Sequence, residues 1–300
     1  TGANGFIGNT LCNSLKSSNN HIRGFVKAMN SDNNSSETEH ISVGDISSKT
    51  NWKDHLKGFD YIIHCAGLTH QMSSIKDINV YNLVNIDGTK RLAEHAVEAG
   101  IKRLVFLSSV KVNGEITDQI TKQKFSHKDN SNPKDLYAIS KLEAEKALWE
   151  ISSRTGLEMV VVRLPLVYGY GVKGNLARLI KLVKSGIPLP LGLIKNQRSM
   201  IGIDNLIDLL IRCIDHPEAN GKTFLASDKE DLSTPELIKL IASSMGRKAN
   251  LFPFPISMLK FLGSVFGKSE EINRLVGSLR IDDSYTKEIL NWTPPLSPEE

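Results

Sequence analysis

The sequence predicts an α/β fold, in which a doubly wound parallel sheet is followed by a smaller, mainly helical C-terminal lobe. Through the first half of the chain, short apolar segments alternate with segments of helical period, as in parallel sheets with helices on both faces. After about residue 165, proline and glycine become frequent and helical stretches dominate. We therefore expect a first domain over residues 1–165 and a lobe over residues 166–300 that partly returns to the first domain.

Residue type and period place the individual elements. Short apolar and β-branched runs bounded by turns predict strands at His21–Lys27, Ile41–Asp45, Tyr61–Cys65, Arg103–Ser108 and Glu158–Leu164. Apolar residues at helical spacing predict helices at Asn9–Ser17, Leu83–Ala99, Asp135–Ser152, Leu176–Ser185, Asn205–Asp215 and Thr234–Met245. Residues 30–39, between the first two strands, are polar and predict turns.

One segment of the C-terminal lobe, Leu251–Phe266, is unusually apolar. Its polar side chains are only Ser257, Lys260 and Ser264. We expect a helix buried within the lobe, because a helix that is hydrophobic all round is usually buried. The alternative is a helix that lies on a membrane surface.

Composition and charge narrow the class of protein. Hydrophobic residues make up 40% of the 300-residue chain and charged residues 23%, as in ordinary globular enzymes. The net charge of +4 comes without long runs of like charge, so we expect an anionic small molecule as partner and no nucleic acid. No apolar stretch is long enough to predict a transmembrane segment. Three widely spaced cysteines, Cys12, Cys65 and Cys213, predict no disulfide framework, no bound metal and a reducing cytoplasmic location.

The chain opens on a glycine-rich loop, Thr1–Gly8. Its three glycines, Gly2, Gly5 and Gly8, are spaced three residues apart and stand directly before a predicted helix. Such a loop lets the backbone approach a ligand closely, and the helix N-terminus favours a pyrophosphate. The pattern predicts a Rossmann-type dinucleotide site. Because a strand should precede such a loop, we expect the N-terminus to be trimmed.

The end of the second strand distinguishes the two nicotinamide cofactors. An acidic residue there binds the ribose 2′-hydroxyl, whereas a basic residue accommodates a 2′-phosphate. Here Lys27 stands at the strand end, which favours NADP(H) over NAD, although a solvated strand end would look the same. At the next strand end, Asp45 and Ile46 are placed to meet the adenine, or simply form a turn.

A tyrosine and a lysine four residues apart form the candidate catalytic pair. Tyr137 and Lys141 share one face of a predicted helix. We expect the ammonium of Lys141 to lower the pKa of the Tyr137 phenol, which could then exchange a proton with a sugar hydroxyl. Ser108 and Ser109 end the preceding strand, and one of their hydroxyls could hold the substrate oxygen.

Several motifs in the same order resemble the extended short-chain dehydrogenases/reductases of the nucleotide-sugar epimerase/dehydratase family. The resemblance covers essentially the whole chain. It includes the glycine loop, the strand and turn Ile62–Gly67, the helix start Asn85–Thr89, the serine strand Ser108–Gly114, the pair Tyr137 and Lys141, and the strand and loop Arg163–Gly169.

The resemblance assigns expected roles to particular residues. It makes Tyr137, Lys141 and Ser109 catalytic, with Ser108 as second choice to Ser109. It implies cofactor contacts by Gly2, Asn4, Gly5, Phe6, Ile7, Gly8, Lys27, Asp45, Ile46, Cys65, Ala66, Gly67, Asn85, Tyr137, Lys141 and Leu164. It implies substrate contacts by Thr69, Ser109, Lys111, Asn175, Arg198 and Arg274, with Asn175 and Arg198 at the diphosphate.

The resemblance leaves several activities open. The first is a 4-epimerase of a UDP-hexose or UDP-N-acetylhexosamine that works through a transient 4-keto sugar with NAD. The second is an NADPH-dependent 4-ketoreductase of a UDP-4-keto-6-deoxy-hexosamine in surface-polysaccharide synthesis, and the third is an epimerase of a lipid-linked sugar diphosphate. A non-catalytic dinucleotide sensor is disfavoured by the intact Tyr137 and Lys141.

One departure from the family pattern bears on the reaction, and one common property of the family bears on the assembly. Sugar 4,6-dehydratases of the family carry an Asp-Glu pair after the catalytic hydroxyl residue, whereas Val110 and Lys111 follow Ser109 here, so dehydration is not expected. Relatives often form homodimers through two helices, which would be Leu83–Ala99 and Asp135–Ser152 in this chain.

Overall fold

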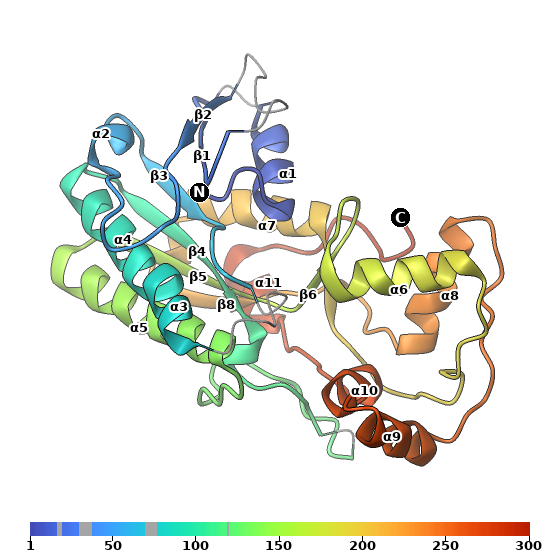
Figure 1. Cartoon of the computed structure of the whole chain (residues 1–300). Coiled ribbons are helices and arrows are strands. Elements are labelled where there is room, and N and C mark those ends of the chain that lie inside the picture. The colour runs from blue at the N-terminus through green and yellow to red at the C-terminus, as the bar shows by residue number, and fades with distance from the viewer. Residues whose placement is uncertain (17–19, 30–37, 70–76, 119) are drawn as a thin grey trace.

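The computed structural model describes all residues except 17–19, 30–37, 70–76 and 119. Its central sheet is parallel, with the strand order β3-β4-β5-β8. The strands β1 and β2, and the strands β6 and β7, form two further parallel two-stranded sheets. The strands are β1 (Arg23–Val26), β2 (Glu39–Ser42), β3 (Tyr61–His64), β4 (Arg103–Ser109), β5 (Glu158–Leu164), β6 (Leu166–Tyr168), β7 (Met200–Gly202) and β8 (Lys222–Leu225). The predicted α/β class is confirmed (Figure 1).

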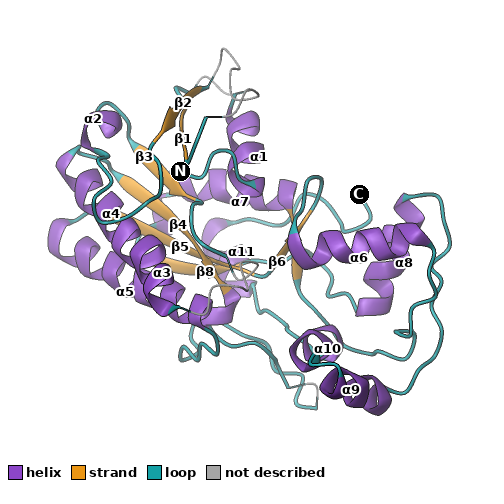
Figure 2. Ribbon diagram, in the orientation of Figure 1, coloured by secondary structure: helices purple, strands orange, loops and turns teal. Residues whose placement is uncertain are grey.

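Helices cover both faces of this sheet and build the small lobe (Figure 2). The α-helices are α1 (Phe6–Leu15), α2 (Lys53–Leu56), α3 (Ile78–Tyr81), α4 (Gly88–Glu98), α5 (Leu136–Thr155), α6 (Gly174–Ser185), α7 (Ile203–Asp215), α8 (Thr234–Ser244), α9 (Ile256–Val265), α10 (Ser269–Val276) and α11 (Ser284–Leu290). A π-helical turn, η2 (Asn82–Asp87), joins α3 to α4, and short 3-10 turns occur at η3 (Val110–Val112) and η4 (Pro217–Ala219).

Alternating side chains of the buried strands form one core on each face of the sheet. Leu104 and Phe106 of β4 pack with α4 and α5, while Val105 and Leu107 pack with α1, α7 and α11. This period of two follows from the pleat of the strand, which points successive side chains to opposite faces. Because both faces are covered, the middle residues of β4 and β5 are all apolar and buried, as the sequence indicated.

Some helices and strands begin or end at other residues than the sequence predicted. The first helix begins at Phe6 rather than Asn9, because the chain turns into the helix directly from Gly5. The second strand lies at Glu39–Ser42, earlier than the predicted Ile41–Asp45, because it follows the register of β1. The predicted helix end at Ser152 extends to Thr155, where Gly156 at φ 79° ends α5. Ser17 and most of the predicted turns at residues 30–39 lie outside the described residues.

The small lobe consists mainly of α6, α8, α9 and α10, to one side of the sheet (Figure 1). Its own core includes Val183, Leu189, Ile238 and Leu259. The C-terminal half also returns to the sheet, because β8 pairs with β5 and α7 packs against β4. Among the described residues, no helix is long and apolar enough to span a membrane.

The prediction that Leu251–Phe266 forms a buried helix is wrong. The helix itself forms, as α9, but only Leu259 and Gly263 within it are buried. Ile256 packs against the core in part, whereas Met258, Phe261, Leu262 and Val265 are exposed. The core of the small lobe meets α9 through Leu259 and Ile256, so this helix has a core on one side alone.

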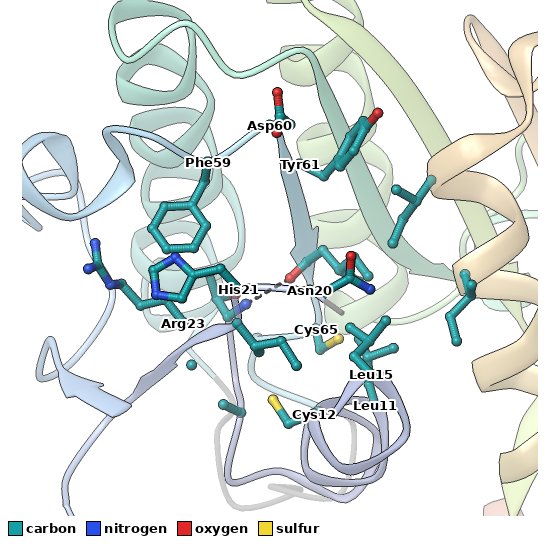
Figure 3. A pocket seen from close by; sticks show the side chains of 18 of the residues that line it. Leu11, Cys12, Leu15, Asn20, His21, Arg23, Phe59, Asp60, Tyr61 and Cys65 are labelled. Atoms are coloured by element: carbon teal, nitrogen blue, oxygen red, sulfur yellow. Dashed lines mark hydrogen bonds between the residues drawn. The ribbon is translucent and has the colours of Figure 1, made fainter. Parts of the chain in front are cut away.

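A cavity of about 290 Å³ separates β1 from β3 (Figure 3). The N-terminal residues bridge its inner end: the Thr1 amine donates to Ile63 O at 2.7 Å, and Ala3 N donates to Phe25 O at 3.0 Å. Residues of the glycine loop, α1, β1, β3 and α7 line this cavity. Ser109, Tyr137 and Lys141 are not among them, so the cavity is separate from the predicted catalytic residues.

Candidate active site

The glycine loop wraps tightly around the N-terminus of α1. Gly2 has φ +73°, and a Cβ atom there would lie 2.9 Å from Ala66 N. A Cβ at Gly8 would lie 2.2 Å from the Gly2 carbonyl oxygen. No side chain caps α1 at Gly5, which leaves the first N–H groups of the helix to a ligand. These features fit a dinucleotide pyrophosphate. The predicted contact residues Asn4, Phe6 and Ile7 belong to this same turn.

The two residues predicted to select the cofactor contact each other. Lys27 Nζ lies 2.6 Å from Asp45 Oδ1, and both side chains are more than two-thirds exposed. Beside them, Ile46 packs at the start of α4, where a Cβ on Gly88 would lie 2.3 Å from Ile46 Cγ2. Lys27 is therefore already paired with a carboxylate, which weakens the argument for a 2′-phosphate. Both cofactor roles stay predictions.

Asn85 holds the turn that follows β3. Its side chain accepts from Leu68 N at 2.8 Å and donates to Leu68 O at 3.0 Å and to Ser140 Oγ at 2.9 Å. It lies in the π-helical turn η2, a distortion that is frequent at functional sites. Ser140 in turn donates to the carbonyl oxygen of Tyr137. Asn85 thus fixes the turn relative to the catalytic helix.

The structure brings the predicted catalytic residues together at the carboxyl end of β4. Tyr137 and Lys141 lie on α5, and Tyr137 is hydrogen-bonded to Ser109, the last residue of β4. Lys141 Nζ donates to Leu107 O at 2.8 Å and lies 4.5 Å from the centre of the Phe106 ring. Leu164, a predicted cofactor residue, pairs with Ser109 across the sheet.

The turn that follows β3 also lies against the amine of Lys141. A Cβ on Gly67 would lie 3.3 Å from Lys141 Nζ and 3.1 Å from the Asn85 amide oxygen. The neighbouring Cys65 thiol has its pKa raised to about 11 by burial, so it stays neutral and does not act as a nucleophile at pH 7. The predicted residues Cys65, Ala66 and Gly67 therefore form a wall beside the lysine.

The expected effect of Lys141 on the Tyr137 pKa is not seen. Burial raises the pKa of Tyr137 to about 12, and the hydrogen bond with Ser109 opposes this only in part. Burial also lowers the pKa of Lys141 to about 8. The lysine amine is directed to the Leu107 carbonyl rather than to the phenol. Loss of water around the buried phenol is therefore the largest influence on the pKa of Tyr137. Without ligands, the phenol is thus protonated at neutral pH.

Ser108 belongs to a buried polar network on the other side of β4. Its hydroxyl donates to Glu145, and Arg163 donates to both oxygens of Glu145, at 3.1 and 2.6 Å. A further bond joins Arg163 to Asn113 at 3.1 Å. This engagement leaves Ser109 as the serine that faces Tyr137. Sequence reasoning missed Glu145, although a glutamate one turn after Lys141 on an otherwise buried helix face is a usable signal.

Replacing Arg163 with methionine is expected to lower the free energy of unfolding by about 3 kcal/mol, because it leaves the Glu145 carboxylate buried without its partner. Urea unfolding followed by circular dichroism measures the change. Arg154→Met, an exposed arginine of α5, is the matched control and should shift the free energy by less than about 0.5 kcal/mol. Equal effects of the two substitutions would contradict a structural role for the buried pair.

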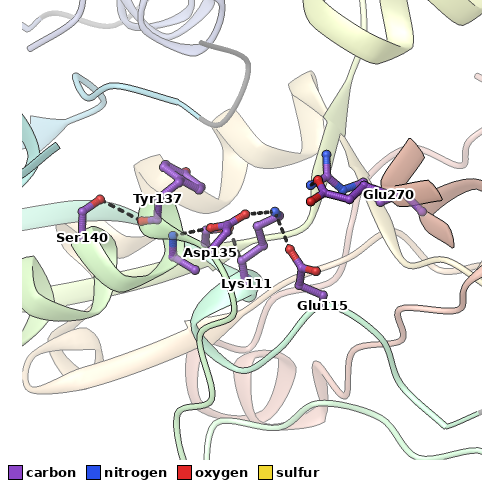
Figure 4. Close-up of polar contacts among 9 residues, drawn as sticks. Lys111, Glu115, Asp135, Tyr137, Ser140 and Glu270 are labelled. Atoms are coloured by element: carbon purple, nitrogen blue, oxygen red, sulfur yellow. Dashed lines mark hydrogen bonds and ion pairs between the residues drawn. The ribbon is translucent and has the colours of Figure 1, made fainter. Parts of the chain in front are cut away.

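Lys111 links the serine strand to the start of α5. Its amine contacts the carboxylates of Asp135 and, at 3.0 Å, Glu115 (Figure 4). Asp135 also caps α5 by accepting from Ala138 N at 2.7 Å, two residues before Tyr137. Lys111 therefore positions the helix that carries the tyrosine, and its predicted contact with substrate stays a prediction.

Two predicted substrate arginines meet in the small lobe. Arg198 donates to the backbone oxygens of Arg274 and Gly277 at 2.8 and 3.2 Å. Burial, and then the charge of Arg274, lower the pKa of Arg198. Two neighbouring guanidinium groups suit an anion such as a diphosphate. The other predicted substrate residues, Asn175 at the start of α6 and Thr69 after β3, are exposed.

Comparison with known proteins places these features in a wider context. The model of the family described as "NAD dependent epimerase/dehydratase family" matches residues 1–226. The chain is 41% identical over 303 aligned residues to a UDP-glucose 4-epimerase of Vibrio cholerae, covering 100% of this chain and 91% of that protein. It is 24% identical to an N-acetyl-alpha-D-glucosaminyl-diphospho-ditrans,octacis-undecaprenol 4-epimerase of Escherichia coli O157:H7, covering 86% of this chain and 76% of that protein.

Solved structures share the same fold. A UDP-glucuronic acid 4-epimerase from Bacillus cereus in complex with NAD superposes with a TM-score of 0.79 at 22% identity, covering 99% of this chain and 92% of that one. A UDP-glucose 4-epimerase from Thermotoga maritima with UDP-glucose has a TM-score of 0.77 at 19% identity, covering 100% and 94%.

Proposed function

Because this chain belongs to the NAD dependent epimerase/dehydratase family, we propose that it is a nucleotide-sugar 4-epimerase. Its substrate is a UDP-hexose or UDP-N-acetylhexosamine, which reacts through a transient 4-keto sugar. The observation that carries this proposal is the hydrogen-bonded pair of Tyr137 and Ser109 beside the buried Lys141, at the carboxyl end of a parallel strand. The relative from Vibrio cholerae supports the choice of a UDP-sugar.

The side chains of this chain divide the work at the sugar. Ser109 holds the C4 oxygen by its hydroxyl, and Tyr137 takes the proton of that oxygen as general base. Tyr137 keeps the proton on its phenol oxygen while the sugar is a ketone and then returns it to O4. In the ligand-free chain the Lys141 amine donates to Leu107 O, and it would favour the deprotonated phenol once it turns from that carbonyl toward Tyr137.

The glycine loop and the helix it opens would hold a nicotinamide dinucleotide. Gly2, Gly5 and Gly8 leave room for its pyrophosphate, and Asn85 and Gly67 shape the wall beside Lys141. When bound, NAD supplies the reversible oxidation and reduction of C4. Tyr137 and Lys141 would border the nicotinamide end, since they lie at the same edge of the sheet.

The nucleotide end of the substrate would lie against the small lobe. Arg198 and Arg274 would hold the diphosphate, with Arg274 exchanging its exposed partner Glu270, at 3.3 Å, for a phosphate oxygen, and Asn175 lies at the start of α6. Thr69 and Lys111 would border the sugar. We also propose a cytoplasmic homodimer in which α4 and α5, which pack side by side, form the contact.

Two other activities are alternatives that the experiment described below distinguishes from 4-epimerisation of a UDP-sugar. A 4-ketoreductase would need NADPH, and Lys27 is the residue that favours it, although Asp45 occupies the lysine amine. An epimerase of a lipid-linked sugar diphosphate is favoured by the exposed apolar face of α9 and by the relative from Escherichia coli O157:H7.

The experiment is to incubate purified protein with UDP-galactose, UDP-N-acetylgalactosamine and a lipid-linked N-acetylhexosamine diphosphate, and to follow the C4 stereochemistry by NMR. No dinucleotide is added, and the bound dinucleotide is identified after denaturation. We expect a C4 epimer from at least one UDP-sugar and NAD released on denaturation. No epimer from either UDP-sugar would overturn the proposal, and epimerisation of the lipid-linked substrate alone would favour the lipid-linked activity. Net reduction of a UDP-4-keto-6-deoxy-hexosamine in a parallel incubation with NADPH would favour the ketoreductase.

A further inference from the structure

Helix α9 packs against the rest of the small lobe along one narrow face. Leu259, 6% exposed, belongs to the core of the lobe. Gly263 lets α10 approach, because a Cβ there would lie 2.7 Å from Ile272 Cγ1. This inner face is enough to hold the helix in place, so the outer side chains of α9 are not needed for the fold.

The outer face of α9 is apolar as well. Met258, Phe261, Leu262 and Val265 are 52%, 66%, 37% and 63% exposed, and they follow the spacing that places side chains on one side of a helix. Phe266, 72% exposed, extends the face at the helix end. A helix on the surface of a water-soluble lobe normally presents polar residues here. A contiguous apolar face of this kind indicates an interaction surface.

The polar residues of α9 form a third stripe, Ser257, Lys260 and Ser264, between its two apolar faces. The surrounding lobe is strongly basic. Segments 173–198 and 233–276, which carry α6, α8, α9 and α10, hold twelve Lys or Arg and three Asp or Glu. Their net charge is +9, whereas the whole chain carries +4, so the remainder of the chain is net negative. Ten of the twelve basic residues are exposed.

We propose that the outer face of α9, formed by Met258, Phe261, Leu262, Val265 and Phe266, docks this protein onto an anionic lipid surface. An apolar face on one side of a helix and a net positive charge, here the +9 of the lobe that carries α9, are the two features that interfacial helices combine. Acidic headgroups attract the basic lobe, and the aromatic and aliphatic side chains insert at the boundary of headgroups and acyl chains. Neither feature alone would bind firmly.

Charge also argues against a second copy of this chain on the same face. A symmetric contact through α9 would bring two lobes of net charge +9 together, and like charges in an interface oppose association. An anionic bilayer has the complementary sign. Docking would leave α10, with the candidate diphosphate residue Arg274, one helix away from the lipid.

The test measures binding of the full chain to vesicles, without any sugar nucleotide, so its outcome does not depend on the proposed activity. We expect co-sedimentation with vesicles of phosphatidylglycerol and phosphatidylcholine, little with phosphatidylcholine alone, and loss of binding as salt screens the charges. The double substitution Phe261→Ser with Phe266→Ser should weaken binding at least about 30-fold. Lys260→Glu should also weaken it.

The matched control is Met29→Ser with Tyr61→Ser, which removes two exposed side chains next to β1 and on β3 and should leave vesicle binding unchanged. Equal urea midpoints would show that all variants are folded. Binding that is independent of lipid charge, or undiminished in the phenylalanine variant, would overturn the proposal. So would a mass in sedimentation equilibrium that falls when the two phenylalanines are replaced, because α9 would then be a protein contact.

Discussion

Replacing Tyr137 with phenylalanine is expected to lower the turnover of the UDP-sugar by about 1,000-fold, within the range that a positioned general acid–base contributes. The substitution removes one oxygen atom and its hydrogen bond with Ser109 and leaves the buried ring in place. Dinucleotide content should not change, because the glycine loop and Lys141 are untouched. Initial rates, together with the dinucleotide released on denaturation, measure both quantities.

The matched control is Tyr61→Phe, at the far end of β3 and partly exposed, which should keep wild-type turnover. If Tyr137→Phe retained more than about a tenth of wild-type turnover, the proton would have another acceptor and the assignment of Tyr137 would be wrong.

Replacing Lys141 with methionine is expected to lower turnover by about 100-fold or more and yet to stabilise the ligand-free protein. The pKa of Lys141 in the folded chain is about 8, below its ordinary value of 10.5, because burial disfavours the charged amine. The unfolded chain therefore binds this proton more tightly. At pH 7 the buried ammonium costs stability, and this cost disappears as the pH rises from about 8 toward 10.5.

Methionine carries no charge, so the variant avoids the cost of burying the ammonium. We expect the free energy of unfolding at pH 7 to rise by about 1–2 kcal/mol. This is less than the lowered pKa of Lys141 alone would give, because the hydrogen bond to Leu107 O is also lost. The difference between variant and wild type should shrink as the pH approaches 10. Urea unfolding at several pH values measures it. Lys146→Met, an exposed lysine of the same helix, should show neither effect. A less stable Lys141→Met protein at pH 7 would contradict the account.

The part of this fold that could be predicted from the sequence is the part that depends on local pattern. Glu158–Leu164 was predicted with its bounds, because a continuous valine-rich run can only be a strand buried on both faces. Spacing placed Tyr137 and Lys141 on one face of a helix and a serine at the end of the preceding strand, whereas the choice of Ser109 over Ser108 came from the family resemblance.

What could not be predicted depends on contacts between distant segments. Glu145 looks like an ordinary helix residue until β5 brings Arg163 against it. Lys111 looked free to bind substrate until the fold placed Asp135 beside it. The pKa of Tyr137 depends on how completely it is buried, which spacing alone does not give. The exposure of α9 depends on which of its faces meets the core of the lobe, and its apolar composition suggested the opposite.

The central claim is that one active site removes and restores the hydrogen on the sugar C4 without net redox change. The most direct measurement uses UDP-galactose deuterated at C4, no added dinucleotide, and mass spectrometry of the epimerised product. We predict that the product keeps its deuterium, at C4 of the opposite configuration, over many turnovers. Loss of the label, or no product beyond the amount of dinucleotide that the protein itself carries, would contradict an epimerase.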